Sequence, residues 1–387
     1  MYNILTLNKI SKVGLGKLGN KYNVSDECSN PDGIILRSYK MHDMELPESL
    51  RAVARAGAGV NNIPIEKCSE KGIVVFNTPG ANANAVKELV ICALLLSSRK
   101  IVQGIEWAKT LIGEGDNVGS LIEKGKSNFV GPEIEGKTLG VVGLGAIGVK
   151  VANAAHHLGM NVVGFDPFLS VDAAWNLTRF AERANSLDEL LTKADYVTIH
   201  VPATPSTKGM FDSEAFAKMK KGARLINFSR DSLVDEADVQ AALESGDLSA
   251  YVTDFASEAL LKNDKVICMP HLGASTPESE ENCAVMAAEE ISDFLENGNI
   301  KNSVNFPNCD MGALGAGSRI TIMHKNVPNM INAITDAIAK KGMNIEHMLN
   351  KSKGDYAYTI LDIATKIDPA FGGELEKAEN VIKVTIL

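Results

Sequence analysis

The stretch that most constrains this chain covers residues 138–166, TLGVVGLGAIGVKVANAAHHLGMNVVGFD. It predicts a buried strand, a glycine-rich turn, a helix and a second strand. The turn fits the pattern G-x-G-x-x-G, in which the first glycine, Gly143, permits the tight bend. Gly145 lets a pyrophosphate approach the backbone, and Gly148 lets the helix pack closely on the strand. The pattern therefore predicts a βαβ unit that binds a dinucleotide.

The cofactor expected in this unit is NAD. Ala146 and Ile147 begin the helix, whose free N–H groups and positive dipole end attract a pyrophosphate. Asp166 ends the second strand, where a carboxylate can bind the ribose hydroxyls and repel a 2′-phosphate. Pro167 and Phe168 follow it, so no arginine comes directly after to bind that phosphate. For a lone G-x-G-x-x-G, a structural turn without a ligand is the alternative.

Composition narrows the class of protein. The 387 residues carry a net charge of −9, which gives no general electrostatic case for binding nucleic acid or an acidic membrane. The six cysteines lie far apart and form no C-x-x-C or metal-ligand pattern, which fits a reducing compartment and no metal site. Because no apolar run is long enough to span a membrane and no signal-peptide core opens the chain, we expect a cytoplasmic protein.

Strand and helix signals alternate along most of the chain, which predicts an α/β fold. We expect a Rossmann-type, doubly wound NAD-binding domain at residues 99–275, inserted in a flavodoxin-like substrate-binding domain formed by residues 1–98 and 276–305. Its polar, glycine-rich segment up to residue 137 is expected to be a surface connector. Residues 318–387 follow a linker and show the order βαββαβ, which is typical of a ferredoxin-like domain.

Several motifs follow one another in a fixed order: GVVGLGAIG, HVPATPSTKGMF, INFSRDSLVDE, a loop that bears a glutamate, and MPHLGAS. Together they resemble the D-isomer-specific 2-hydroxyacid dehydrogenases. RAGAGVNNI and NTPGANANAVKEL narrow the resemblance to members that act on a phosphorylated acid. It implies NAD-dependent, reversible oxidation of 3-phospho-D-glycerate to 3-phosphohydroxypyruvate, the first step of L-serine biosynthesis. Two alternatives remain: another substrate, such as 2-hydroxyglutarate, lactate or glycerate, and a non-catalytic NADH-sensing regulator.

The resemblance also implies three catalytic residues. His271 is the expected acid/base, because an ordinary imidazole pKa of about 6.5 suits reversible proton transfer at neutral pH. Arg230 is expected to bind the substrate carboxylate with its planar guanidinium. Glu258 is expected to orient His271, although its loop is one residue shorter than the family pattern and lacks the usual proline. The alternatives are a core histidine, a surface arginine paired with Asp231, and an exposed loop acid.

Further residues fall at positions where the family binds cofactor or substrate. Contacts with the cofactor are expected from Thr78, Pro202, Thr207 and Asp254, of which Asp254 would contact the nicotinamide amide. Binding of the substrate, including its phosphate, is expected from Arg37, Ser38, Arg55 and the turn that contains Gly57 and Gly59. The alternatives are ordinary turn glycines and solvated arginines.

The C-terminal part resembles an ACT domain, which in this family regulates the enzyme. The resemblance implies that His324, Asn326 and Asn344 bind L-serine as an effector, and that the protein is a homodimer or homotetramer. The family's N-x-P-G turn reads N-V-P-N here, so Asn329 adds a side chain where the ligand would pack. A dimerisation module that senses nothing is the alternative.

Overall fold

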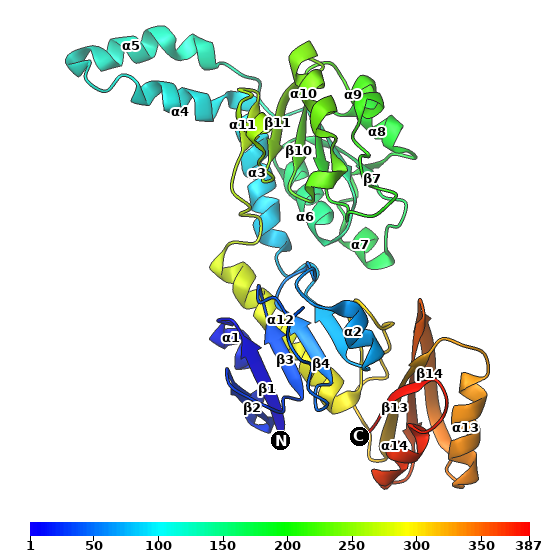
Figure 1. Cartoon of the computed structure of the whole chain (residues 1–387). Coiled ribbons are helices and arrows are strands. Elements are labelled where there is room, and N and C mark those ends of the chain that lie inside the picture. Colours follow the sequence, from blue (N-terminus) through cyan, green and yellow to red (C-terminus); the bar gives the residue numbers. More distant parts are fainter. The chain divides into compact units, whose positions relative to one another are not determined.

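The structure is a computed structural model that describes all 387 residues, and the chain divides into two compact units (Figure 1). Unit 1 comprises Met1–Ala81 and Pro277–Leu387, and unit 2 comprises Asn82–Thr276. Unit 1 is therefore discontinuous, and unit 2 is a single insertion within it. The three-part division predicted from the sequence, with residues 318–387 as a domain of their own, stays a prediction.

Unit 1 contains a five-stranded parallel sheet with the order β2-β1-β3-β4-β5. Its strands are β1 (Tyr2–Leu7), β2 (Tyr22–Ser25), β3 (Gly33–Leu36), β4 (Ala52–Arg55) and β5 (Val74–Asn77). Its helices are α1 (Lys12–Leu15), η1 (Gly19–Lys21), α2 (Ile65–Glu70) and α12 (Pro277–Asn297). The sequence did not predict the short elements β2, α1 and α2, which lack a full hydrophobic period.

Helix α12 covers this sheet although it lies about two hundred residues away in the sequence (Figure 1). Ala287, Ile291 and Phe294 on one face of the helix are buried in the same core as Ile4. Gly33 on β3 leaves room for the helix, because a Cβ there would lie 2.5 Å from the Cδ1 atom of Ile291. Helix α12, which follows unit 2 in the sequence, therefore completes the hydrophobic core of the five-stranded sheet.

The C-terminal part of unit 1 is a four-stranded antiparallel sheet with the order β14-β15-β13-β16. Its elements are β13 (Ser318–Lys325), α13 (Met330–Lys340), β14 (Ile345–Lys353), β15 (Tyr356–Ile363), α14 (Ala370–Leu375) and β16 (Val381–Ile386). Ile320, Ile322, Ile334, Ile338 and Phe371 form its buried core between sheet and helices. The predicted order βαββαβ is confirmed.

A buried arginine ties this C-terminal sheet to the segment that precedes it. Arg319 donates from Nε and Nη2 to the two carboxylate oxygens of Asp362, over 2.6 and 2.9 Å. Its Nη1 donates to the backbone carbonyls of Asn297 and Gly312, each over 2.8 Å. Burial of this guanidinium is therefore compensated by a bidentate ion pair and by backbone acceptors.

Unit 2 is a doubly wound domain with a seven-stranded parallel sheet in the order β12-β11-β10-β9-β6-β7-β8. The strands are β6 (Thr138–Val142), β7 (Asn161–Phe165), β8 (Glu182–Arg183), β9 (Tyr196–Ile199), β10 (Ala223–Asn227), β11 (Leu248–Thr253) and β12 (Val266–Cys268). The helices around it are α3 (Ala83–Arg99), α6 (Ala146–His157), α7 (Val171–Asn176), α8 (Leu187–Lys193), α9 (Ser213–Lys218), η4 (Asp231–Leu233), α10 (Glu236–Ser245) and α11 (Glu258–Leu261). The predicted Rossmann-type fold class is confirmed.

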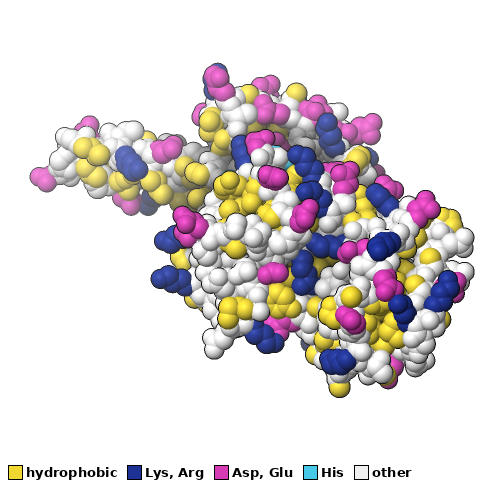
Figure 2. Space-filling view, turned by 60° about the horizontal axis from the view of Figure 1, so that its bottom comes forward, with side chains coloured by type: hydrophobic (Ala, Val, Ile, Leu, Met, Phe, Trp, Pro, Cys, Tyr) yellow, Lys and Arg dark blue, Asp and Glu magenta, His cyan; other side chains and the backbone are white.

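A helical arm extends from the sheet of unit 2 (Figure 1). It consists of α4 (Ile101–Lys109), η2 (Gly115–Asn117), α5 (Val118–Gly125) and η3 (Lys126–Phe129), none of which buries a residue. A surface connector was predicted here, and the helix α5 within it was not, because a glycine-rich sequence hid it. Gly125 is needed for packing, since a Cβ there would lie 2.3 Å from the Trp107 ring. Figure 2 shows hydrophobic side chains along the arm.

No helix in the structure is both long enough and apolar enough to cross a membrane.

Candidate active site

The glycine turn between β6 and α6 is shaped by contacts of its own backbone. Gly143 has a φ of 89°, and a Cβ there would lie 2.5 Å from the carbonyl oxygen of His200. A Cβ on Gly148 would lie 1.9 Å from the carbonyl oxygen of Gly143. No atom lies within 4 Å of a Cβ built on Gly145. The turn therefore excludes side chains at its two ends and is open at Gly145, where a pyrophosphate could approach.

The start of α6 supplies the donors that such an anion needs. The first backbone bond of the helix comes from Val149 N–H to the Gly145 carbonyl, over 3.1 Å. The preceding N–H groups, those of Ala146, Ile147 and Gly148, have no acceptor within the helix. These donors and the open face of Gly145 fit the pyrophosphate of a dinucleotide.

Asp166 lies beside this turn at the end of β7. Its Oδ2 accepts a hydrogen bond from the backbone N–H of Leu144, and its Oδ1 accepts one from Phe168, each over 2.8 Å. A cavity of about 300 Å³ opens next to it, lined by Leu144, Gly164, Asp166, Pro167, Leu169, Leu177, Ala181, Glu182 and Arg183. The cavity fits the adenosine half of the cofactor. Sequence reasoning missed Arg183, because β8 is too short to show a pattern.

The other predicted cofactor residues lie in both units. In unit 2, the Thr207 hydroxyl donates to the Pro202 carbonyl over 2.7 Å and so closes the loop after β9. His200 precedes that loop, and burial lowers its pKa to about 3, so the ring is neutral and structural. In unit 1, the Thr78 side chain is buried and its hydroxyl has no hydrogen-bond partner.

Three predicted residues follow adjacent parallel strands of unit 2. Arg230 follows β10, Asp254 directly follows β11, and His271 follows β12. Because these strands are neighbours in the sheet, the three residues meet at its carboxyl edge, where ligands bind in such folds. The distance between His271 Nδ1 and Asp254 Oδ2 is 3.7 Å. The ring of Phe255 lies edge-on to the His271 imidazole, with 5.2 Å between ring centroids.

Asp254 is the most constrained charge at this edge. Its side chain is 1% exposed, and neither carboxylate oxygen has a hydrogen-bond partner. Burial raises the pKa of Asp254 above its ordinary value, while the charges of His271 and Arg230 act in the opposite direction. Arg230 is exposed. Its backbone carbonyl accepts a hydrogen bond from Asn227 Nδ2 over 2.8 Å. The Arg230 guanidinium, which can bind a carboxylate, therefore lies at the same sheet edge as the partly exposed His271 side chain.

Glu258 lies elsewhere than predicted. It is the first residue of α11, after the N-cap Ser257, and its side chain is 85% exposed. Its carboxylate pairs with Lys262, one helical turn further on, over 2.6 Å. The predicted contact with His271 is therefore replaced by a solvent-exposed i,i+4 pair, because the shortened loop starts a helix at this residue.

In unit 1, an asparagine organises the loop that carries Arg37 and Ser38. Oδ1 of Asn8 accepts hydrogen bonds from the backbone N–H groups of Arg37, Ser38 and Tyr39, over 3.3, 3.0 and 2.8 Å. The guanidinium of Arg37 forms an ion pair with Glu280 on α12. Sequence reasoning missed Asn8, whose only signal was an asparagine directly after a strand.

Arg55 and the turn after β4 lie against the same loop. Nε of Arg55 donates to the carbonyl of Arg37 over 3.0 Å. A Cβ on Gly57 would lie 2.8 Å from Nη1 of Arg55, so this glycine makes room for the guanidinium. Gly59 lies two residues further along the same turn, and Thr78 N–H donates to the Gly57 carbonyl over 3.2 Å. The predicted substrate residues of unit 1 therefore form one cluster at the carboxyl ends of β3 and β4.

The predicted effector residues of the C-terminal sheet differ in their environments. His324 is buried, with Nδ1 2.8 Å from the Lys325 carbonyl and Nε2 3.0 Å from the Thr359 hydroxyl. Asn326 donates to the Gly354 carbonyl over 3.0 Å, and Asn344 is exposed. Both ring nitrogens of His324 and the side-chain amide of Asn326 are thus used in hydrogen bonds, whereas Asn344 is exposed.

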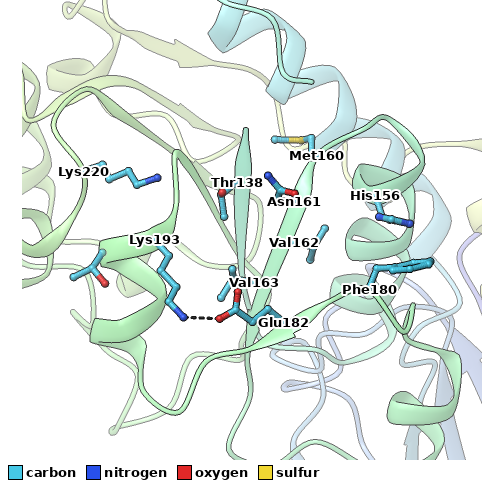
Figure 3. Close-up of a pocket in the computed structure, with 11 residues that line it drawn as sticks. Thr138, His156, Met160, Asn161, Val162, Val163, Phe180, Glu182, Lys193 and Lys220 are labelled. Atoms are coloured by element: carbon cyan, nitrogen blue, oxygen red, sulfur yellow. Dashed lines mark hydrogen bonds and ion pairs between the residues drawn. The ribbon is translucent and has the colours of Figure 1, made fainter. Parts of the chain in front are cut away.

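A cavity of about 700 Å³ in unit 2 lies away from the glycine turn (Figure 3). Its lining includes Thr138 and Asn161, the first residues of β6 and β7, so it is at the amino edge of the sheet. Figure 3 shows Lys193 with its ion pair to Glu182 on one side and the stacked rings of His156 and Phe180 on the other. The cavity is therefore separate from the edge that carries His271. No group of three or more metal-ligating side chains is present.

Comparison with known proteins identifies the family. Residues 92–273 match the family model described as "D-isomer specific 2-hydroxyacid dehydrogenase, NAD binding domain". The D-3-phosphoglycerate dehydrogenase of Methanocaldococcus jannaschii is 33% identical over 342 residues, which cover 86% of this chain and 63% of that protein. The enzyme of the same name from Bacillus subtilis is 33% identical over 326 residues, covering 79% and 59%. The chain thus spans about 60% of the length of these two relatives.

Other relatives and solved structures agree. A Schizosaccharomyces pombe relative is 32% identical over 349 residues, covering 83% of this chain and 70% of that protein. The NAD⁺-bound 3-phosphoglycerate dehydrogenase of Entamoeba histolytica has a TM-score of 0.59 at 26% identity, covering 79% of this chain and 98% of that one. The D-mandelate dehydrogenase of Rhodotorula graminis, at 24% identity and a TM-score of 0.68, covers 81% and 99% and shares the fold. This chain belongs to the D-isomer specific 2-hydroxyacid dehydrogenase family, and its unit 2 carries the NAD-binding domain of that family.

Proposed function

We propose that this protein oxidises 3-phospho-D-glycerate to 3-phosphohydroxypyruvate with NAD, reversibly, as the first step of L-serine biosynthesis. The observation that carries the proposal is the set of Arg230, Asp254 and His271 on adjacent strand ends of an NAD-binding domain. The relatives named D-3-phosphoglycerate dehydrogenase support the choice of substrate.

The side chains of this protein supply the acid/base and the carboxylate-binding group of the reaction. Bound NAD would supply the hydride acceptor for C2 of the substrate. The His271 imidazole takes the proton of the C2 hydroxyl and returns it in the reverse direction. The Arg230 guanidinium binds the carboxylate and polarises the C2 oxygen. Glu258 would have to leave its ion pair with Lys262 before it could serve His271.

The phosphate of the substrate is assigned to the unit 1 cluster. Arg37 and Arg55 provide positive charge there, and the turn with Gly57 and Gly59 provides backbone N–H groups. In the structure, Glu280 neutralises Arg37 in part. A phosphate must therefore replace Glu280 as the partner of Arg37, and a smaller neutral-tailed 2-hydroxy acid would not need to. That ion pair is the observation that favours the second candidate, a dehydrogenase of another 2-hydroxy acid.

Assembly and regulation are part of the same proposal. We propose a homo-oligomer, since Ile105, Ile112 and Val130 on the arm are exposed hydrophobic side chains that a second copy of the chain could cover. The C-terminal sheet is proposed to bind an L-serine effector through Asn326 and Asn344. The six cysteines are all free thiols, which supports a reducing, cytoplasmic location.

The test is formation of NADH from NAD and 3-phosphoglycerate, together with its consumption by 3-phosphohydroxypyruvate. Glycerate, lactate and 2-hydroxyglutarate are the comparison substrates. We expect Arg37→Gln to raise KM for 3-phosphoglycerate at least tenfold and to change KM for glycerate little. Equal turnover of glycerate and 3-phosphoglycerate would favour the second candidate. Tight NADH binding with no turnover of any of these acids would favour an NADH-sensing regulator.

A further inference from the structure

The environment of His271 points to a residue that the sequence assigned to another role. We propose that Asp254 is the positioning residue of His271: its Oδ2 accepts a hydrogen bond from Nδ1–H, which fixes the ring and leaves Nε2 to exchange a proton with the substrate. This inference deepens the proposed function and rests on it for the substrate, but the pairing itself can be measured without turnover.

The geometry of the two side chains supports this pairing. Asp254 Oδ2 lies 3.7 Å from His271 Nδ1, which is within ion-pair distance and longer than a hydrogen bond. Catalytic hydrogen bonds are often long before the ligand binds and tighten in the complex. Phe255 limits the available rotations, since its ring contacts the imidazole edge-on. Asp254 itself follows β11 directly, so its backbone is fixed by the sheet.

Asp254 also lacks any other donor. Both of its carboxylate oxygens are buried without a hydrogen-bond partner. A buried charge without partners costs several kcal/mol, by order of magnitude, so it is rarely retained without a role. Nδ1–H of His271 would satisfy Oδ2, and Oδ1 remains for the nicotinamide amide, the contact first assigned to this residue.

The exposed fractions of the two side chains favour Asp254 over Glu258 as the partner of His271. The Glu258 side chain is 85% exposed and neutralised by Lys262, whereas the Asp254 side chain is 1% exposed. A charge acts on its neighbour several times more strongly in the interior than through water. The groups that act on Asp254 are His271 and Arg230, both of which can be positive. The carboxylate that faces His271 from the protein interior is therefore that of Asp254, whereas that of Glu258 lies in solvent.

The consequence for the reaction is a defined proton path. In oxidation, the C2 hydroxyl proton passes to Nε2 of His271 and the C2 hydride passes to NAD, which yields the ketone and NADH. The positive charge that forms on the ring is then balanced by Asp254. Removal of this carboxylate destabilises the imidazolium, so the ring gains its proton only at lower pH.

The first test is the pH profile of kcat/KM for oxidation in the full-length protein. We expect Asp254→Asn to lower kcat at least tenfold and to move the acidic limb by about one pH unit toward lower pH. KM for the substrate should stay within twofold, and Asp254→Glu should restore part of the limb shift. Glu258→Gln should leave the limb where it is. A limb that moves in Glu258→Gln, or that moves in neither variant, overturns the proposal.

The second test reads the pairing directly. ¹⁵N-labelled histidine side chains report the tautomer, and His271→Gln assigns the signal among the seven histidines. We expect neutral His271 to carry its proton on Nδ1, and Asp254→Asn to remove that preference, because the amide can turn its N–H₂ toward the ring. An unchanged tautomer in this variant, with NADH binding intact, overturns the proposal. If the wild-type chain turns over no 2-hydroxy acid, the proposed function fails while this measurement still decides the pairing.

Discussion

Two buried charged side chains of this molecule, Arg319 and Asp254, differ in their hydrogen bonds. Arg319 in the C-terminal sheet of unit 1 donates to Asp362 and to three backbone carbonyls. Asp254 at the sheet edge of unit 2 has no hydrogen bond at either carboxylate oxygen. The two histidines nearby differ in the same way: both ring nitrogens of His324 are used inside the sheet, whereas the His271 side chain is 60% exposed.

This difference separates a structural group from a reactive one. A buried ion pair repays the cost of leaving water only when its hydrogen bonds are complete, as they are at Arg319. At Asp254 they are incomplete, so part of that cost is still present in the unliganded protein. A bound cofactor and an adjacent imidazolium would supply the missing partners. We therefore expect changes at Arg319 to affect stability and changes at the unit 2 edge to affect chemistry.

The largest expected effect is on turnover by His271→Ala. Loss of a positioned acid/base should reduce kcat by about 10²–10⁴-fold, because water must then carry the proton. NADH binding, followed by fluorescence, should be unchanged, since the glycine turn and Asp166 are untouched. The urea midpoint should also stay close to that of the wild type, because the side chain is 60% exposed. A variant that loses stability but keeps its turnover would reverse the comparison.

The next effect is on stability, from Arg319→Ala. This change leaves Asp362 without its bidentate partner and should reduce the free energy of unfolding by about 3–5 kcal/mol. Urea denaturation followed by circular dichroism measures it. The matched control is the double variant Arg319→Met with Asp362→Leu, which removes both charges and should recover most of the loss. If the double variant is as unstable as the single one, the ion pair is not what Arg319 contributes.

Sequence patterns predicted the fold well wherever a periodic apolar segment formed the element. The strand and helix of the glycine turn, the long α12 and the βαββαβ order of the C-terminal sheet all have such a signal. The arm helix α5 and the two-residue strand β8 lack it, because glycines or extreme brevity removed the period. Arg183 on β8 was missed for the same reason, and Asn8 was missed because its only signal was an asparagine directly after a strand.

The candidate site was predictable in its members more than in its pairings. The spacing of motifs placed Arg230, Asp254 and His271 on neighbouring strand ends, and the sheet order brings them together. Spacing could not predict that Glu258 starts a helix and pairs with Lys262, because one residue of loop length decides that local choice. It also could not predict burial, which distinguishes Asp254 from Glu258.

Glu290 on α12 offers a third case that can break the comparison. One of its carboxylate oxygens accepts from Asn302 over 2.7 Å and the other is buried without a partner, yet no cation acts on it. Burial raises the pKa of Glu290 from 4.5 to about 8, so the folded protein keeps this proton where the unfolded chain loses it. Stability should therefore fall as pH rises from about 4.5 to 8, by roughly 2–4 kcal/mol.

The variant Glu290→Gln tests this expectation by urea denaturation between pH 5 and pH 9. Glutamine keeps the acceptor for Asn302 and cannot ionise, so the variant should be more stable than the wild type near pH 8 and similar near pH 5. The matched control is Glu289→Gln at the exposed neighbouring position, which should leave the slope nearly unchanged. The same slope in Glu290→Gln and wild type would mean that an unpaired buried carboxyl is not a sign of a held proton here.

The smallest expected effect is that of L-serine on the C-terminal sheet. Both ring nitrogens of His324 are used and Asn326 already donates to the Gly354 carbonyl, so few groups remain to bind it. Asn329 also adds a side chain at a φ of 69°, where the family has glycine. At ten times its Kd, a ligand raises the free energy of unfolding by about 1.4 kcal/mol. We expect the melting temperature of the wild type to rise by a few degrees only at high L-serine, and that of Asn329→Gly to rise at lower concentrations, since removing the side chain opens the turn. Asn344→Ala should abolish the rise in both backgrounds, with D-serine as the control ligand. No rise in any variant would mean that every polar group of this sheet is structural, so that the contrast with the unit 2 edge is complete.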